Sequence, residues 1–144
     1  MKQAKNILDN KGSDIWSIGS DASVLDAITL MAEKRIGALL VMNGTHLNGV
    51  FSERDYARKV VLMGKSSRET AVQEIMTSEV VVAKPAHTVE ECMALMTDKR
   101  IRHLPVVEDD AVVGVLSIGD LVKAIIEEQQ FQIEQLENYI TTGY

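Results

Sequence analysis

The sequence is poor in the residues that mark most metal and redox sites. Its 144 residues include a single cysteine, Cys92, so no disulfide can form within the chain. The three histidines stand apart, without the short spacings of metal ligands. Cys92 falls at an apolar position of a helical pattern, which favours a buried structural thiol over a reactive one. We therefore expect neither a metal site nor cysteine chemistry.

Long hydrophobic runs and an excess of basic residues are absent as well. No apolar stretch approaches the roughly 20 residues that a membrane span needs, and the first residues, MKQAKNILDNKG, lack the apolar segment of a signal peptide. We therefore expect a cytoplasmic protein without membrane insertion. A net charge of −6 counts against nucleic acid as the main partner. It leaves room for a small anion in a local basic pocket.

What the chain does contain is an internal repeat. When each residue of segment 15–60 is aligned with the residue 65 positions later, twelve positions are identical without a gap. This agreement indicates a tandem duplication. The identical residues of the first copy are Val24, Leu30, Met31, Lys34, Arg35, Ile36, Leu39, Val41, Gly49, Val50, Ser52 and Asp55.

Each copy begins with the pattern of a strand followed by a helix. The predicted strands are DIWSIG, residues 14–19, and EVVVAK, residues 79–84. Ser23 and Thr88 come next, and both are favourable N-caps for the helical patterns that follow.

The second half of each copy predicts a hairpin and a further helix. Tight turns are expected at Asn43-Gly44 and Asp109-Asp110. The last helix of each copy is expected to begin at Ser52 or Ser117. The order is β-α-β-β-α twice, an α+β fold. Because one copy of about 60 residues buries too little apolar surface alone, we expect the two to pack sheet against sheet around a shared core, with pseudo-two-fold symmetry.

The predicted division of the chain is a first repeat at 1–68, a second at 69–128 and a helical extension at 129–144. The last helix carries an apolar stripe at intervals of three and four residues. A stripe on a helix that overhangs its domain is usually buried by a partner, so we expect a homodimer that uses this helix. The stripe consists of Val122, Ile125, Ile126, Ile133, Leu136 and Ile140.

The motif Gly-hydrophobic-x-Ser-x-x-Asp ends the hairpin of both copies, as GVFSERD and GVLSIGD. It resembles the CBS domain, and the pair resembles the tandem CBS or Bateman module over roughly residues 5–128. The resemblance rests on ALLVMNGTHLNGVFSERDYARKV and on EIMTSEVVVAKPAHTVEECMALMTDKRIRHLPVVEDDAVVGVLSIGDLVKAI. It implies a regulatory unit that binds an adenosine nucleotide, AMP, ADP, ATP or NAD(H), with S-adenosylmethionine as an alternative.

The chemistry of the motif suits such a ligand independently. An aspartate one turn into a helix can accept two hydrogen bonds from the vicinal hydroxyls of a ribose. A neighbouring phosphate would be attracted to the start of the same helix.

The resemblance further implies two clefts between the copies. In one, Ser52 and Asp55 hold the ribose, and the walls are Lys84, Val89, Arg102 and His103. In the other, Ser117 and Asp120 hold the ribose, and the walls are Gly19, Val24, Gly37 and Ala38.

The two clefts are expected to differ in charge. Arg54 stands in the first motif where Gly119 stands in the second. With Arg102 and His103 it makes the Asp55 site favourable for phosphorylated ligands, whereas the Asp120 site relies more on apolar contact and backbone amides. Arg68, between the copies, is a further candidate for a phosphate contact.

Structural interpretations of the same residues stay open. Ser52 and Ser117 also suit plain N-caps, Asp55 and Asp120 plain first-turn acids, Arg54 and Arg68 solvated surface charges, and His103 a packed strand residue. Trp16, the only tryptophan, suits core or dimer packing as well as base stacking.

Three classes of function follow. The leading one is a non-catalytic sensor that signals in trans to an unknown effector protein, since the repeats occupy most of the chain. An enzyme is not expected, because the sequence has no phosphate-binding Gly-x-x-x-x-Gly-Lys-Ser/Thr loop and no Ser-His-Asp set. A structural oligomerisation module with empty clefts is the third.

Overall fold

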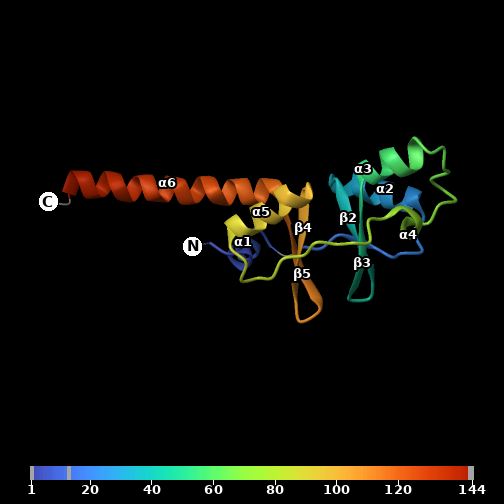
Figure 1. The fold of residues 1–144 in the computed structure, drawn as a ribbon, viewed down its shortest axis with the longest axis horizontal. Coiled ribbons are helices and arrows are strands. Elements are labelled where there is room, and N and C mark those ends of the chain that lie inside the picture. The colour runs from blue at the N-terminus through green and yellow to red at the C-terminus, as the bar shows by residue number, and fades with distance from the viewer. Residues whose placement is uncertain (1, 13, 143–144) are drawn as a thin grey trace.

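The computed structural model describes residues 2–12 and 14–142. Figure 1 shows two halves side by side, with one long helix extending from the second. The elements are α1 (Ala4–Lys11), β1 (Ser17–Ile18), α2 (Val24–Lys34), β2 (Ala38–Asn43), β3 (His46–Ser52), α3 (Glu53–Asp55), η1 (Tyr56–Val61), α4 (Val72–Ile75), α5 (Val89–Lys99), β4 (His103–Glu108), β5 (Ala111–Ser117) and α6 (Ile118–Thr142).

Two small sheets lie next to each other in the middle of the molecule (Figure 1). The first has the order β1-β2-β3, with β1 parallel to β2 and β2 antiparallel to β3, and the second is the antiparallel pair β4-β5. Strand β3 contacts β5. The predicted α+β fold, with the two repeats packed sheet to sheet, is confirmed.

The predicted strand at 79–84 is wrong. Only Ala83 pairs with the second sheet, through a bridge to Val106. The next residue, Lys84, donates its backbone N–H to Nδ1 of His87 at 2.7 Å instead. Pro85 has no N–H to donate, so the ladder cannot continue past this point.

The two hairpins agree closely with each other. Their registers place Ala38 opposite Ser52 and His103 opposite Ser117, and each has an irregularity at the same point of the repeat. The turn at Asp109-Asp110 forms as predicted, with both residues at positive φ (52° and 64°). In the first hairpin the turn lies one residue later than predicted, because Asn43 still belongs to β2 and pairs with His46.

Both predicted helix caps form. The hydroxyl of Ser23 accepts the N–H of Asp26 at 3.0 Å, and that of Thr88 accepts the N–H of Glu91 at 3.1 Å. Both helices also end alike, at an arginine in the left-handed conformation, Arg35 or Arg100. The two repeats therefore agree in backbone conformation, as well as in sequence, at the ends of these helices.

The helix after Ser52 is less regular than expected. Ser52 is its N-cap, as predicted, but α3 has only three residues and continues as the π-helix η1. Its last bond joins the N–H of Leu62 to the carbonyl of Ala57, five residues back, at 3.0 Å.

The buried apolar residues form two clusters, one for each sheet and its helices, instead of the one shared core predicted from the sequence. The cause is the alternation along the strands: Leu39 and Val41 face the helices of the first cluster, so the intervening Leu40 points toward the other repeat. Between the two sheets lie a thin apolar layer, which includes Leu40, and two clefts.

The short leading helices are exchanged between the repeats. Helix α4 precedes the second repeat but places Val72 and Ile75 in the first cluster. Helix α1 precedes the first repeat but places Ala4, Ile7 and Leu8 in the second. Each leading helix thus completes the core of the opposite repeat along the chain.

Two equivalent glycines permit this exchange. A Cβ on Gly114 would lie 2.6 Å from Cδ2 of Leu8, and a Cβ on Gly49 would lie 2.7 Å from Sδ of Met76. Only glycine lets α1, and the residues that directly follow α4, approach the sheets this closely.

Helix α6 has 25 residues and extends well beyond the second repeat (Figure 1). Much of the predicted stripe is exposed, including Ile126 at 58% and Leu136 at 63%. None of the helices in the described part of the chain is both long and apolar enough to cross a membrane.

Candidate functional site

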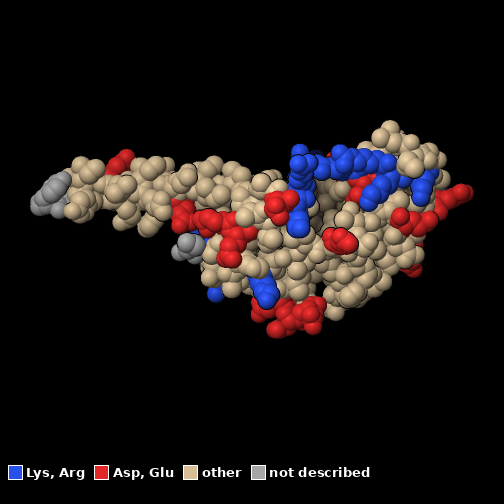
Figure 2. Space-filling view, in the orientation of Figure 1, with Lys and Arg blue, Asp and Glu red and all other residues tan. Residues whose placement is uncertain are grey.

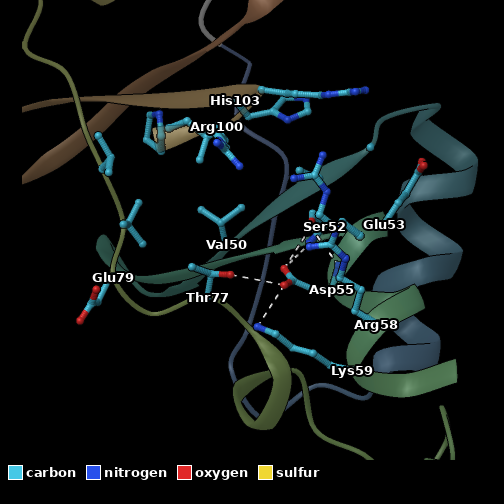
Figure 3. A pocket seen from close by; sticks show the side chains of 18 residues that line it. Val50, Ser52, Glu53, Asp55, Arg58, Lys59, Thr77, Glu79, Arg100 and His103 are labelled. Carbon is cyan, nitrogen blue, oxygen red and sulfur yellow. Dashed lines mark hydrogen bonds and ion pairs between the residues drawn. The ribbon is translucent and has the colours of Figure 1, made fainter. Parts of the chain in front are cut away.

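The larger of two clefts between the repeats lies beside Asp55 and has a volume of about 620 Å³. We call it the Asp55 cleft. Figure 3 shows Ser52 and Asp55 on one side of it and Arg100 and His103 on the other. The lining residues are Gly37, Ala38, Val50, Ser52, Glu53, Arg54, Asp55, Arg58, Lys59, Thr77, Glu79, Val80, Val81, Arg100, Ile101, Arg102, His103 and Pro105.

Ser52 and Asp55 form a reciprocal capping box at one end of this cleft. The hydroxyl of Ser52 accepts the N–H of Asp55 at 3.1 Å, while Oδ2 of Asp55 accepts the backbone N–H and the hydroxyl of Ser52, both at 3.0 Å. The N-cap interpretation of Ser52 is therefore confirmed. Asp55 is only 8% exposed, yet its carboxylate still borders the cleft.

The second oxygen of Asp55 has two further donors. Oδ1 accepts the hydroxyl of Thr77 at 3.3 Å and lies 3.1 Å from Nζ of Lys59 (Figure 3). Nζ of Lys59 also donates to the carbonyl of Ile75 at 3.2 Å. A carboxylate accepts about four hydrogen bonds, so a ligand that offers hydroxyl donors would compete with Thr77 and Lys59 for Oδ1.

The rim of the Asp55 cleft is strongly basic. Five Lys and Arg side chains line it against the three carboxylates of Glu53, Asp55 and Glu79. Figure 2 shows basic side chains gathered beside the hollow between the two halves, although the whole chain is acidic. The five are Arg54, Arg58, Lys59, Arg100 and Arg102.

Three of these cations and Thr77 were not identified from the sequence. Arg58 and Lys59 each had a detectable signal, because they follow Arg54 and Asp55 by four residues on the same helical face. Arg100 is identical to Arg35 of the first copy, but this identity did not predict where its side chain would lie. Nothing in the sequence pointed to Thr77, because it comes near Asp55 only through its antiparallel bridge to Val50 of β3.

His103 lies between the two clefts and borders both. Burial lowers its pKa below the ordinary value of a histidine, and the nearby charges of Lys11 and Arg102 lower it further, against the opposing effects of Asp120 and Glu53. The imidazole is therefore neutral at neutral pH and can either donate or accept a hydrogen bond there.

The smaller cleft, of about 360 Å³, lies beside Ser117, and we call it the Ser117 cleft. Its walls are mostly apolar. Trp16 is among them, 41% exposed and with Nζ of Lys34 4.4 Å from its ring centre, so it is not a core residue. The lining residues are Lys11, Gly12, Asp14, Trp16, Ile36, Ala38, Leu39, Leu40, Val50, His103, Val115 and Ser117.

Ser117 and Asp120 repeat the capping box of the first motif. The hydroxyl of Ser117 accepts the N–H of Asp120 at 3.1 Å, and Oδ2 of Asp120 accepts the N–H of Ser117 at 2.8 Å. The same oxygen lies 2.6 Å from Nζ of Lys11, at the end of α1. Burial would raise the pKa of Asp120, but the bonds from Lys11 and Ser117 outweigh it and lower the pKa below its ordinary value.

The predicted wall residues are only partly brought to the clefts. Arg102 and His103 border the Asp55 cleft as expected, and Ala38 borders the Ser117 cleft as expected, although it borders the Asp55 cleft as well. Gly37 borders only the Asp55 cleft, although it was assigned to the other site. Of the remaining assigned residues, Val24 and Val89 are core residues, at 0% and 1% exposure. Among the described residues that line either cleft, Gly19, Lys84 and Arg68 are also missing.

The positions of Val80 and Val81 account for part of this difference. They line the Asp55 cleft from a segment without regular secondary structure, where the sequence suggested a strand. Val24 and Val89 begin α2 and α5, and their side chains point inward from the first turn. The wall is thus built from the segment ahead of the helix.

Two tandem matches to the CBS-domain profile cover residues 8–62 and 72–127. The chain belongs to the CBS-domain family. CBSX3, a mitochondrial CBS domain-containing protein of Arabidopsis thaliana, is 41% identical over 138 residues, which cover 92% of this chain and 66% of the plant protein. The cytoplasmic location expected for this chain stays a prediction.

Solved structures show the same CBS pair. A proposed signal-transduction protein with CBS domains from Burkholderia ambifaria MC40-6 is 50% identical, with a TM-score of 0.85, over 89% of this chain and 96% of that one. A hexameric CBS-CP12 protein from bloom-forming cyanobacteria is 30% identical, with a TM-score of 0.73, over 85% of this chain and 70% of that one. Tandem CBS domains of this kind are typically regulatory and ligand-binding units.

Proposed function

We propose that this CBS pair is a non-catalytic regulatory module that binds an adenosine nucleotide in the Asp55 cleft and signals in trans by a change of conformation. The observation that carries the proposal is the geometry of that cleft: a nearly buried carboxylate at one end, a basic rim and an apolar wall between them.

The carboxylate of Asp55 suits a ribose. Its Oδ1 already holds two donors from the protein, the hydroxyl of Thr77 and the ammonium of Lys59. The two vicinal hydroxyls of a ribose offer the same number of donors and would replace them without leaving the carboxylate unpaired.

The rim suits phosphate. Arg54, Arg58, Arg100 and Arg102 offer planar forks of N–H donors, the geometry that binds phosphate oxygens in pairs. Displacement from Asp55 would add the ammonium of Lys59 to this set. AMP, ADP, ATP and NAD(H) all present phosphate to such a rim. S-adenosylmethionine carries a positively charged sulfonium instead, so the same cations disfavour it.

The wall between these two ends suits an adenine ring. Val50, Val80, Val81 and Pro105 line it, and His103 adds a neutral polar edge. A volume of about 620 Å³ lies within the range of roughly 300 to 1,000 Å³ that is usual for small-molecule sites.

Ligand binding can reach the rest of the molecule through Lys59. Its ammonium joins Asp55 to the carbonyl of Ile75, the last residue of α4. A ribose that displaces Lys59 from Asp55 would loosen this link between η1 and α4. The change can affect an effector protein only as far as the ligand prefers one arrangement over the other.

We further propose that two copies associate through α6. Val122, Ile126, Ile133 and Leu136 are exposed and, with Gln129 between them, follow the four-three spacing of a two-stranded coiled coil. The hexameric cyanobacterial relative supports assembly of this fold into oligomers. The same stripe also favours the second candidate, an oligomerisation module whose clefts stay empty.

Isothermal titration with AMP and adenosine tests the nucleotide proposal. We expect AMP to bind, Asp55→Asn to weaken it at least tenfold, and adenosine to bind at least tenfold more weakly than AMP because it lacks the phosphate. Asp110→Asn is the matched control, since it makes the same change in an exposed turn where asparagine tolerates positive φ. ATP incubated with the protein should be recovered unchanged.

Equal affinity in wild-type protein and Asp55→Asn would refute the ribose contact. Equal affinity for AMP and adenosine would refute the role of the basic rim. If no adenine nucleotide at millimolar concentration raises the melting temperature, the oligomerisation module is favoured, because a bound ligand in large excess stabilises the folded state.

A further inference from the structure

The second aspartate of the repeat is held by a lysine from another element. Nζ of Lys11 lies 2.6 Å from Oδ2 of Asp120 and donates to the carbonyl of Val115 at 2.8 Å. In the first repeat the corresponding lysine, Lys59, lies on the same helix as its aspartate, four residues later. The two pairs are therefore built differently, although the motif is the same.

This difference changes what each cleft presents to a ligand. Asp55 itself borders its cleft. Among the described residues that border the Ser117 cleft, Lys11 and Ser117 are present and Asp120 is not. The end of α1 thus stands between the cleft and the carboxylate that the repeat would offer to a ribose.

Helix α1 is firmly docked, so Lys11 is not a loose surface side chain. Ala4, Ile7 and Leu8 are buried in the second cluster. The backbone N–H of Ala4 also donates to the carbonyl of His87 at 2.8 Å, and that of Lys5 to the carbonyl of Pro85 at 3.0 Å. These contacts fix where the helix ends, one residue before Gly12.

We propose that Lys11 acts as a latch that closes the second CBS site to nucleotides, so that the intact module binds one nucleotide per chain. The proposal rests on the function proposed for the Asp55 cleft. A diol that approaches Asp120 must break a charge-assisted hydrogen bond and displace the ammonium from the carbonyl of Val115. In the first repeat a ribose would displace Lys59 from a comparable ion pair. There, however, η1 places the lysine at the basic rim, where its ammonium can contact a phosphate of the ligand.

Counting bound AMP by native mass spectrometry and titration calorimetry tests the latch. We expect one AMP per wild-type chain, lost in Asp55→Asn. Lys11→Ala should bind two, and Lys11→Ala with Asp120→Asn should bind one again. Lys5→Ala is the matched control, because it removes the same charge from an exposed position of α1, six residues before the lysine that contacts Asp120. Lys11→Arg should keep one AMP, since arginine preserves the charged donor.

Two AMP per wild-type chain would overturn the latch, and so would one AMP in Lys11→Ala when wild-type protein binds one at the Asp55 cleft. If wild-type protein binds none and Lys11→Ala binds one that Asp120→Asn removes, the latch holds and the function proposed for the Asp55 cleft fails. If none of the variants binds AMP, both fail.

Discussion

At the scale of single residues, the two motif aspartates show that an identical local sequence does not make an identical site. Ser52-Asp55 and Ser117-Asp120 form the same capping box. What separates them lies outside the motif: Thr77 and Lys59 contact the first carboxylate, and Lys11 contacts the second. We therefore expect any ligand discrimination between the clefts to depend on side chains that the repeat does not share.

His103 should make the stability of the protein depend on pH. Burial, Lys11 and Arg102 lower its pKa, while Asp120 and Glu53 act in the opposite direction. As the pH falls through about 6.5, the unfolded chain takes up a proton that the folded chain does not, so the free energy of unfolding decreases. Urea unfolding of wild-type protein and His103→Gln between pH 8 and 5.5 measures this.

The expected result is that wild-type protein loses stability relative to His103→Gln as the pH falls, because glutamine does not titrate. Parallel profiles for the two proteins over this range would contradict the lowered pKa of His103.

At the scale of elements, the fit of each leading helix against a glycine can be tested by exchanging volume. Gly114→Ala would place a methyl 2.6 Å from Cδ2 and 2.9 Å from Cδ1 of Leu8, and we expect it to cost about 1 to 3 kcal/mol. Leu8→Ala removes the obstructing atoms and should itself cost about 2 to 3 kcal/mol. In the double variant the alanine at 114 should cost much less, which a double-mutant cycle in urea measures.

Gly49 provides the contrasting case. A Cβ there would meet Sδ of Met76 at 2.7 Å and also the backbone carbonyl of Thr77 at 2.7 Å. We therefore expect Gly49→Ala to destabilise the Met76→Ala variant almost as much as the wild-type protein, because no side-chain substitution removes the backbone carbonyl of Thr77. Rescue of the same size in both cycles would show that the two helices pack alike.

The sequence predicts elements where the deciding interactions are local. Ser23 and Thr88 cap their helices, and Asp109-Asp110 makes its turn, because each bond joins residues close in the chain. The strand at 79–84 was mistaken because its apolar run suggested pairing that forms only at Ala83. Pro85 ends the pairing after Ala83, and Pro105 ends it before Ala83 because it has no N–H to donate to the carbonyl of Val81. The site was predictable only in part for the same reason. Ser52 and Asp55 bond to each other three residues apart in the chain, whereas Thr77 and Arg100 come to the cleft from distant segments that only the folded chain brings together.

At the scale of the whole molecule, α6 carries an apolar stripe that remains exposed in a single chain. Its stripe continues past the second repeat, and Figure 2 shows that this overhang carries few charged side chains. Segment 129–142 contains Glu134 and Glu137 but no lysine or arginine. A second copy of the same helix would cover the stripe.

Light scattering at micromolar concentration tests this association. We expect a dimer or larger even-numbered assembly for wild-type protein, and a shift toward monomer in Ile133→Glu, which places a charge in the middle of the stripe. Gln135→Glu adds the same charge two residues away on the opposite face and should leave the mass unchanged. A wild-type monomer, or an Ile133→Glu variant with the wild-type mass, would contradict the proposal.

The exchange of leading helices also sets an order of events during synthesis. Met76 and Thr77 leave the ribosome soon after Gly49, so the first repeat has every part of its core once α4 is made. Leu8 is made early, but its partner Gly114 comes more than a hundred residues later. The apolar face of α1 therefore stays uncovered until the second repeat has been made, which leaves it open to non-native contacts during synthesis.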